Sequence, residues 1–114
     1  EGWRINEKSV LDFSPLLAVL AGCPKGNNGA SYGAALFHAT LAAGMAEWVG
    51  RAAHRHNINV VALGGGCFHN GILLHSLTDR LTAQGLRVLT WQKMQPNDSA
   101  ISLGQAWVAL QSIR

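Results

Sequence analysis

The stretch that most constrains this chain covers residues 60–70, Val-Val-Ala-Leu-Gly-Gly-Gly-Cys-Phe-His-Asn. Its first four residues are apolar and include β-branched side chains, which is typical of a buried strand. Three glycines follow at once, and Asn70, a preferred helix-capping residue, precedes an amphipathic segment over residues 71–84. The pattern predicts a strand, a bare loop and a helix in direct succession.

Such a junction is suited to binding an anion, above all a phosphate. Because glycine has no Cβ, the backbone N–H groups of Gly64, Gly65 and Gly66 can turn toward a ligand, and the helix N-terminus adds further donors. The stretch matches neither well-known fingerprint, since His69 stands where G-x-G-x-x-G needs Gly and no Lys-Ser/Thr pair follows the glycines. A tight turn without a ligand is the alternative interpretation.

The composition limits the class of protein. Of 114 residues, 48% are hydrophobic and 13% are charged, which argues against disorder. The nine Lys and Arg residues form no basic run, so nucleic acid is disfavoured as a partner. No apolar run approaches the ~20 residues of a membrane span, so no membrane partner is expected. Cys23 and Cys67 form neither a disulfide framework nor a zinc cluster, which predicts reduced thiols in a cytoplasmic protein.

The N-terminal half carries clear turn and helix signals. Residues 2–6 are expected to form a short strand or the tail of one, and residues 23–29 a loop. Ser14 is predicted to be the N-cap of a helix that has Pro15 at its first position and ends near Gly22. A long helix is predicted over residues 30–56, with small residues that allow close approach of its neighbours.

The C-terminal half predicts a parallel β-α-β unit. Strands are predicted over residues 59–63 and 87–91, with a helix between them that has Gly85 as its C-terminal cap. The buried face of this helix is expected to carry Leu73 or Leu74, Leu77 and Leu81. A final helix over residues 99–113 is expected to pack through Leu103, Trp107, Leu110 and Ile113. Two parallel strands that are apolar on both faces are unstable alone, so the chain is interpreted as the C-terminal part of a larger α/β domain.

A few side chains are candidates for chemistry. Asp98 is interpreted either as a helix N-cap, worth about 1 kcal/mol, or as a carboxylate in the same mouth as the glycine loop. Cys67 is expected to be a small buried filler. His38 is expected to pack in the core, with the pocket wall as the alternative, and His54 and His56 to lie at a polar helix end.

Three motifs occur in an informative order: Phe37-His38, the glycine stretch ending at Asn70, and Asn97-Asp98 followed by Leu-Gly-Gln-Ala at residues 103–106. Together they resemble the C-terminal part of HypF, the carbamoyltransferase family of nickel-iron hydrogenase maturation. The resemblance implies an actin-like, sugar-kinase-like ATPase fold, shared with the tRNA threonylcarbamoyl-adenosine transferase. Residues 30–114 would be the C-terminal lobe of the nucleotide-binding domain, incomplete by itself, and residues 1–29 a connecting segment with a short helix.

The resemblance also implies an activity for the full-length protein. Carbamoyl phosphate and ATP would give carbamoyl adenylate, and the carbamoyl group would pass to the C-terminal cysteine of HypE. Carried over by motif, Gly64, Gly65, Gly66 and Asn70 would bind the nucleotide, and Asp98 would ligate a divalent metal, either Mg, Zn or Fe. The implied partners are HypE and the rest of the same polypeptide, which holds an upstream lobe and the adenylate-forming domain.

Some features depart from that family. His69 stands where the family usually has Gln, and Ser99-Ala100 follow the Asn-Asp pair where Gly-Gly is usual. The family's His-x-x-x-His pair lies upstream and has no counterpart here, so no catalytic residue is assigned and the chain alone is expected to be inactive. The alternatives are an O-carbamoyltransferase, a tRNA threonylcarbamoyl transferase relative, or a non-catalytic interaction lobe.

Overall fold

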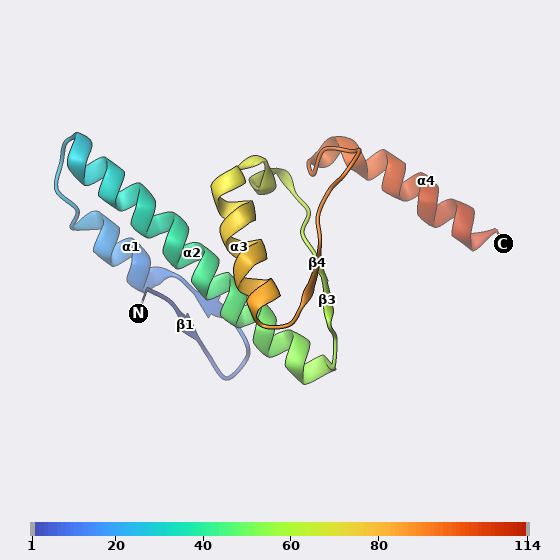
Figure 1. Cartoon of the computed structure of the whole chain (residues 1–114), viewed down its shortest axis with the longest axis horizontal. Helices are drawn as coiled ribbons and strands as arrows, with labels where there is room; N and C mark the ends of the chain where they lie inside the picture. The colour runs from blue at the N-terminus through green and yellow to red at the C-terminus, as the bar shows by residue number, and fades with distance from the viewer. Residues whose placement is uncertain (1, 114) are drawn as a thin grey trace.

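The computed structural model describes residues 2–113, which form helices and two small sheets (Figure 1). The helices are α1 (Ser14–Ala21), α2 (Asn27–His56), α3 (Gly71–Ala83) and α4 (Ile101–Ser112). The strands are β1 (Arg4–Ile5), β2 (Leu11–Asp12), β3 (Val60–Ala62) and β4 (Arg87–Leu89). Two 3₁₀ turns, η1 (Gly66–His69) and η2 (Asp98–Ala100), follow the two parallel strands.

The predicted parallel β-α-β unit is confirmed. Strands β3 and β4 pair in parallel, with Val61 opposite Val88, and the backbone N–H of Leu63 extends the ladder to the carbonyl of Leu89 at 2.9 Å. Helix α3 connects them and ends at Ala83, and Gly85, just beyond the C-cap Gln84, has a φ of +82°. The N–H of the next residue, Leu86, donates to the carbonyl of Leu81, so the predicted glycine cap takes the form of a Schellman motif.

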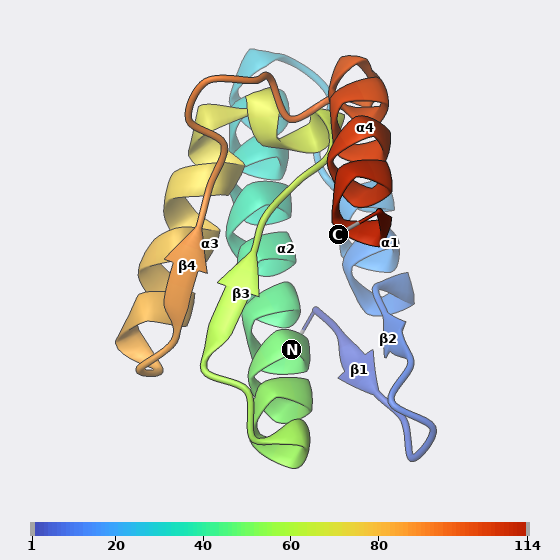
Figure 2. The same ribbon diagram turned by 90° about the vertical axis from the view of Figure 1, so that its right-hand side faces the viewer.

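The hydrophobic core lies between α2, α3 and one face of this parallel sheet (Figures 1 and 2). Its buried members are Ala42, Ala46, Leu63, Phe68, Leu73, Leu77 and Leu81. The predicted close approach along α2 is confirmed at Gly44, where an added Cβ would lie 2.7 Å from the ring of Phe13. The parallel sheet, covered by helices on one face, agrees with the predicted α/β class.

The N-terminal segment corrects two predictions. The expected strand is β1, which pairs antiparallel with β2. Ser14 is the first residue of α1 and not its N-cap, because the carboxylate of Asp12 accepts its backbone N–H at 2.8 Å and also its hydroxyl. The predicted loop over residues 23–29 is shorter than expected, because the positive φ of Gly26 turns the chain early and α2 begins at Asn27.

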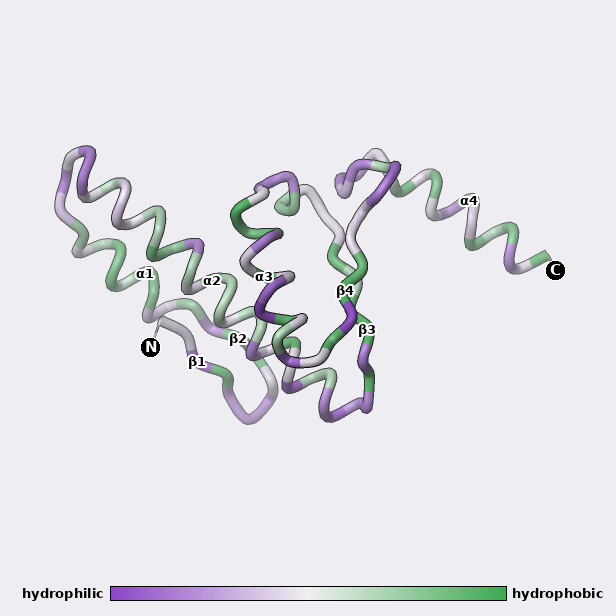
Figure 3. The backbone as a smooth tube through the Cα atoms, in the orientation of Figure 1, coloured by the Kyte–Doolittle hydropathy of each residue, from purple (hydrophilic) through white to green (hydrophobic). Residues whose placement is uncertain are grey.

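The final helix corrects a third prediction. Helix α4 begins two residues later than expected and projects away from the outer face of the β3–β4 sheet (Figures 1 and 2). Its predicted packing residues are exposed, at 55% for Leu103 and 61% for Trp107, because no element within residues 2–113 covers them. Figure 3 shows apolar residues along both this helix and the sheet. None of the helices in the described chain has the combination of length and apolar character that a bilayer crossing requires.

Candidate functional site

The glycine loop follows β3 directly and is open to solvent. Gly65 has a φ of +107° and a ψ of 157°, a region of backbone space that only glycine adopts readily. A Cβ added at Gly64, Gly65 or Gly66 would meet nothing within 4 Å, so this face of the loop is bare. Phe68, which is 8% exposed, anchors the following turn in the core. The loop therefore combines a fixed backbone with an accessible surface.

Asn70 is the N-cap of α3, as the sequence predicts. Its side-chain oxygen Oδ1 accepts from the backbone N–H groups of Ile72 at 3.1 Å and Leu73 at 3.2 Å. These bonds fix the orientation of the amide, so that its nitrogen Nδ2 faces His38 Nε2 at a distance of 2.8 Å. Both ends of the Asn70 side chain are therefore tied to the protein.

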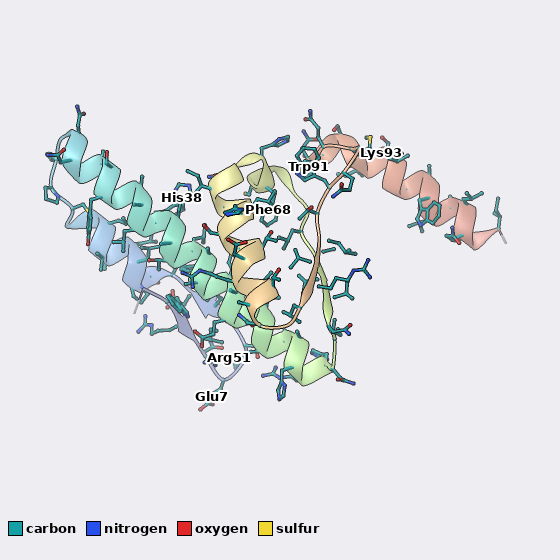
Figure 4. The ribbon with its side chains drawn as sticks, in the orientation of Figure 1. Glu7, His38, Arg51, Phe68, Trp91 and Lys93 are labelled. Atoms are coloured by element: carbon teal, nitrogen blue, oxygen red, sulfur yellow. The ribbon has the colours of Figure 1, made fainter. Side chains whose placement is uncertain are left out.

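His38 lies at the edge of the site, so the prediction of core packing is wrong. It projects from α2 toward the beginning of α3 (Figure 4), and its side chain is only partly buried. Its Nδ1 lies 2.8 Å from the carbonyl oxygen of Ala34, one turn earlier in α2. The sequence signal for this position is the Phe-His pair, whose rings meet edge to face at 5.5 Å. The hydrophobic periodicity does not predict the contact between His38 and Asn70, because these residues are 32 positions apart in the sequence.

Asp98 begins η2 after β4 and is exposed. The N-cap interpretation of Asp98 is wrong, because the capping residue is Asn97, whose Oδ1 accepts from the backbone N–H of Ser99 at 3.1 Å. Among the bonds within residues 2–113, none engages the carboxylate of Asp98. The carboxylate is therefore available to a ligand.

A hydrogen bond joins the segment after β3 to the segment after β4 at the carboxyl edge of the parallel strands. The Nδ2 of Asn97 donates to His69 Nε2 at 3.3 Å, and the ring of His69 lies 6.5 Å from that of Trp91. A hollow of about 300 Å³ lies between the ends of β3 and β4 and the segment that follows β4. Its lining includes Leu63, Gly64, Leu89, Trp91, Met94 and Pro96. His69 thus links the turn after the glycine loop to the segment that carries Asp98.

A larger hollow, of about 610 Å³, lies elsewhere between α2, α3 and Trp3. Its polar residues include Glu47, which accepts a hydrogen bond from the Trp3 indole at 2.8 Å and also pairs with Arg51. We assign the candidate site to the glycine edge, because ligands of parallel sheets bind beyond the carboxyl ends of the strands. Size alone does not distinguish a site from an uncovered groove.

The thiol of Cys67 is exposed, so the prediction of a buried filler is wrong. The reason is local, because η1 turns Phe68 into the core and leaves its neighbour facing solvent. In the part of the chain that the structure describes, no three His, Cys, Asp or Glu side chains gather to hold a metal ion. Asp98 offers one carboxylate, which fits a Mg²⁺ ion that also binds phosphate oxygens.

The fold and this edge together define an α/β subdomain with a glycine loop. Residues 1–105 match the protein family described as carbamoyltransferase, Kae1-like domain, second subdomain. The chain belongs to this family of carbamoyltransferase subdomains.

The similar curated proteins are HypF proteins. The chain is 45% identical over 111 residues to carbamoyltransferase HypF2 of Cupriavidus necator, covering 97% of this chain and 13% of that protein. It is 40% identical over 114 residues to carbamoyltransferase HypF of Rhizobium leguminosarum bv. viciae, covering 98% and 14%. A carbamoyltransferase HypF homolog of Cupriavidus necator is 45% identical over 107 residues, covering 92% and 27%. The chain thus spans a small part of each relative, and no solved structure matches it with comparable significance.

Proposed function

We propose that this chain supplies the nucleotide-binding edge of a HypF-type carbamoyltransferase. The observation that carries the proposal is the hydrogen bond between Asn97 and His69, which joins the segment of Asp98 to the glycine loop. In this proposal, residues 30–114 are the C-terminal lobe of an actin-like ATPase domain in a cytoplasmic protein. An upstream lobe of the same polypeptide closes the pocket.

The proposed ligand is ATP or carbamoyl adenylate. The backbone N–H groups of Gly64, Gly65 and Gly66 donate to phosphate oxygens, and the positive end of α3 lies directly beyond them. Asn70 donates to the same nucleotide. Asp98 is one ligand of a divalent cation, with Mg the best fit to a single carboxylate and Zn or Fe as the other candidates. Such a cation would supply positive charge beside the phosphates.

The proposed reaction is completed by other parts of the polypeptide. The adenylate-forming domain converts carbamoyl phosphate and ATP to carbamoyl adenylate, and phosphate and pyrophosphate are released. The carbamoyl group then passes to the C-terminal cysteine thiol of HypE, and AMP leaves. Amides fixed at the phosphates favour this step, since negative charge grows on the leaving group as the thiolate attacks. This chain binds and orients the nucleotide, and alone it is inactive.

ATP titration of the full-length protein tests the proposal. We expect Asn70→Ala combined with Asp98→Ala to weaken ATP binding at least about tenfold, since several polar contacts are lost. Asp79→Ala, which removes an exposed carboxylate from α3, is the matched control and should leave the affinity unchanged. Unaltered ATP affinity in the double variant would favour the alternative in which this chain is a non-catalytic interaction lobe.

A further inference from the structure

The contact between His38 and Asn70 ties α2 to the end of the glycine loop. Every other hydrogen bond of the Asn70 side chain in the described chain is made by its oxygen, which accepts from two backbone N–H groups of α3. The amide can therefore not be turned around without losing both bonds of the cap. Its nitrogen must be the group that faces His38.

This geometry determines where the proton of the imidazole lies. The amide nitrogen of Asn70 can only donate, so Nε2 of His38 must accept and carries no hydrogen. The carbonyl of Ala34 can only accept, so Nδ1 of His38 must carry the hydrogen and donate it. The edge-to-face contact with Phe37 further restricts the ring. The three groups form one directed chain of donors, from Asn70 through His38 to the backbone of α2.

We propose that His38 is a positioning residue that holds Asn70 as a hydrogen-bond donor toward the nucleotide. The inference deepens the proposed function and rests on it, because it specifies how Asn70 acts there. The two acceptor positions of Oδ1 are occupied by the cap, and one hydrogen of Nδ2 is taken by His38. Only the second hydrogen of Nδ2 remains for a ligand.

The proposal specifies which ligand atoms Asn70 recognises. A group that offers one hydrogen and no free acceptor binds a phosphate oxygen, a hydroxyl oxygen or an unprotonated ring nitrogen. It does not bind a donor such as an exocyclic amine. His38 contributes without touching the ligand, since its own two nitrogens are both used within the protein.

The test is ATP titration of the full-length protein with single and double variants. Asn70→Asp keeps an oxygen for the helix cap but lacks the amide hydrogens, so it should weaken ATP binding. His38→Ala should weaken binding about fivefold, the factor that one ordinary hydrogen bond is worth. His38→Gln, whose side-chain oxygen can accept from Asn70, should restore binding to within about twofold.

The double variant separates positioning from direct contact. If His38 acts through Asn70, adding His38→Ala to Asn70→Asp should cause no further loss of ATP affinity. His56→Ala, which removes an exposed histidine of the same helix, is the control and should bind as the wild type does. Additive losses in the double variant would overturn the role of His38. The same role would be overturned if His38→Ala bound ATP normally while Asn70→Asp bound it more weakly. Either result would leave the proposed function standing. Unchanged affinity in every Asn70 and Asp98 variant would instead remove the proposed function.

A spectroscopic measurement tests the position of the hydrogen on the His38 ring even if His38→Ala fails to fold. Nitrogen-15 labelling of histidine in the wild-type protein reports which ring nitrogen carries the hydrogen, and His38→Gln identifies the signal. We expect His38 to be the neutral form with its hydrogen on Nδ1. A hydrogen on Nε2 would contradict the proposal, since Asn70 could not then donate to it.

Discussion

Helices α3 and α4 are nearly equal in length, with 13 and 12 residues, yet they are buried very differently. On α3, Leu77 and Leu81 are both 0% exposed. On α4, Trp107 is 61% and Leu110 is 43% exposed. The difference shows that the local sequence determines whether a helix has an apolar face, whereas the burial of that face depends on which other elements pack against it. α3 has α2 and the sheet opposite it, and α4 has nothing within residues 2–113.

The chain is less compact and more exposed than a globular protein of its size. Its accessible surface is 8150 Å², whereas a compact monomer of 12.2 kDa exposes about 6,100 Å². Its radius of gyration is 17.0 Å, against about 13 Å for a compact chain of this length. Part of the exposed apolar surface lies on α4 and on the outer face of the parallel sheet, where Val60 and Leu89 are also exposed. We propose that the remainder of the polypeptide covers this side.

The largest expected effect is at the buried helix. Leu77→Ala should lower the free energy of unfolding of this chain by about 3 kcal/mol, because it leaves a cavity at a fully buried position. Chemical denaturation monitored by circular dichroism measures the change. A loss below about 1 kcal/mol would mean that α3 is packed no better than α4.

The exposed helix should respond in two ways. Trp107→Ala should change the unfolding free energy of this chain by less than about 0.5 kcal/mol, because the side chain is mostly in water. In the full-length protein the same change should lower the melting temperature clearly, because the indole is then covered. Equal melting temperatures for the wild-type and variant full-length proteins would contradict a covered α4.

The glycine loop should show an intermediate effect. Gly65→Ala should cost about 1–3 kcal/mol, because its φ of +107° strains any side chain. Gly64→Ala is the matched variant, since an added Cβ there meets nothing within 4 Å and the residue has no positive φ. It should leave stability nearly unchanged and weaken ATP binding by the full-length protein. If Gly64→Ala bound ATP normally, close approach of a ligand at this residue would be excluded.

The smallest effect is expected at the exposed β1–β2 hairpin. Hydrogen bonds from the hydroxyl and the backbone N–H of Ser14, with a smaller contribution from Arg4, lower the pKa of Asp12 below its usual value. Because the folded pKa lies below the unfolded one, this stabilisation is present above about pH 4 and is lost as the pH falls through the folded pKa. Asp12→Asn should therefore flatten the acid side of the stability profile slightly, as thermal unfolding between pH 2 and about pH 6 would measure. An unchanged acid profile would contradict this role of Asp12.

The elements that could be predicted from the sequence are those with local causes. The strand before the glycines, the cap at Asn70 and the turn at Gly85 just after α3 all depend on neighbouring residues. The contact of His38 depends on a residue far away in the chain, and Trp107 is exposed because nothing within residues 2–113 lies opposite it, so periodicity could supply neither. The cap at Ser14 failed for a local reason, because the hydroxyl of Ser14 donates to the carboxylate of Asp12 and does not accept from a backbone N–H of the helix.

Most residues of the candidate site could be predicted from the sequence, but the contacts between them could not. Gly65 and Asn70 follow from their residue types, but Asn97 takes the capping role expected of Asp98. The link from Asn97 to His69 arises only when the ends of both strands are brought to one edge. Such polar contacts between distant segments have no periodic signature in a single sequence.

A structure of the full-length protein with a bound non-hydrolysable ATP analogue tests the central claim most directly. The account predicts phosphate oxygens about 3 Å from the backbone nitrogens of the glycine loop, with the carboxylate of Asp98 on the same side of the nucleotide. A nucleotide bound away from this edge, for example in the hollow beside Trp3 and Arg51, would contradict it.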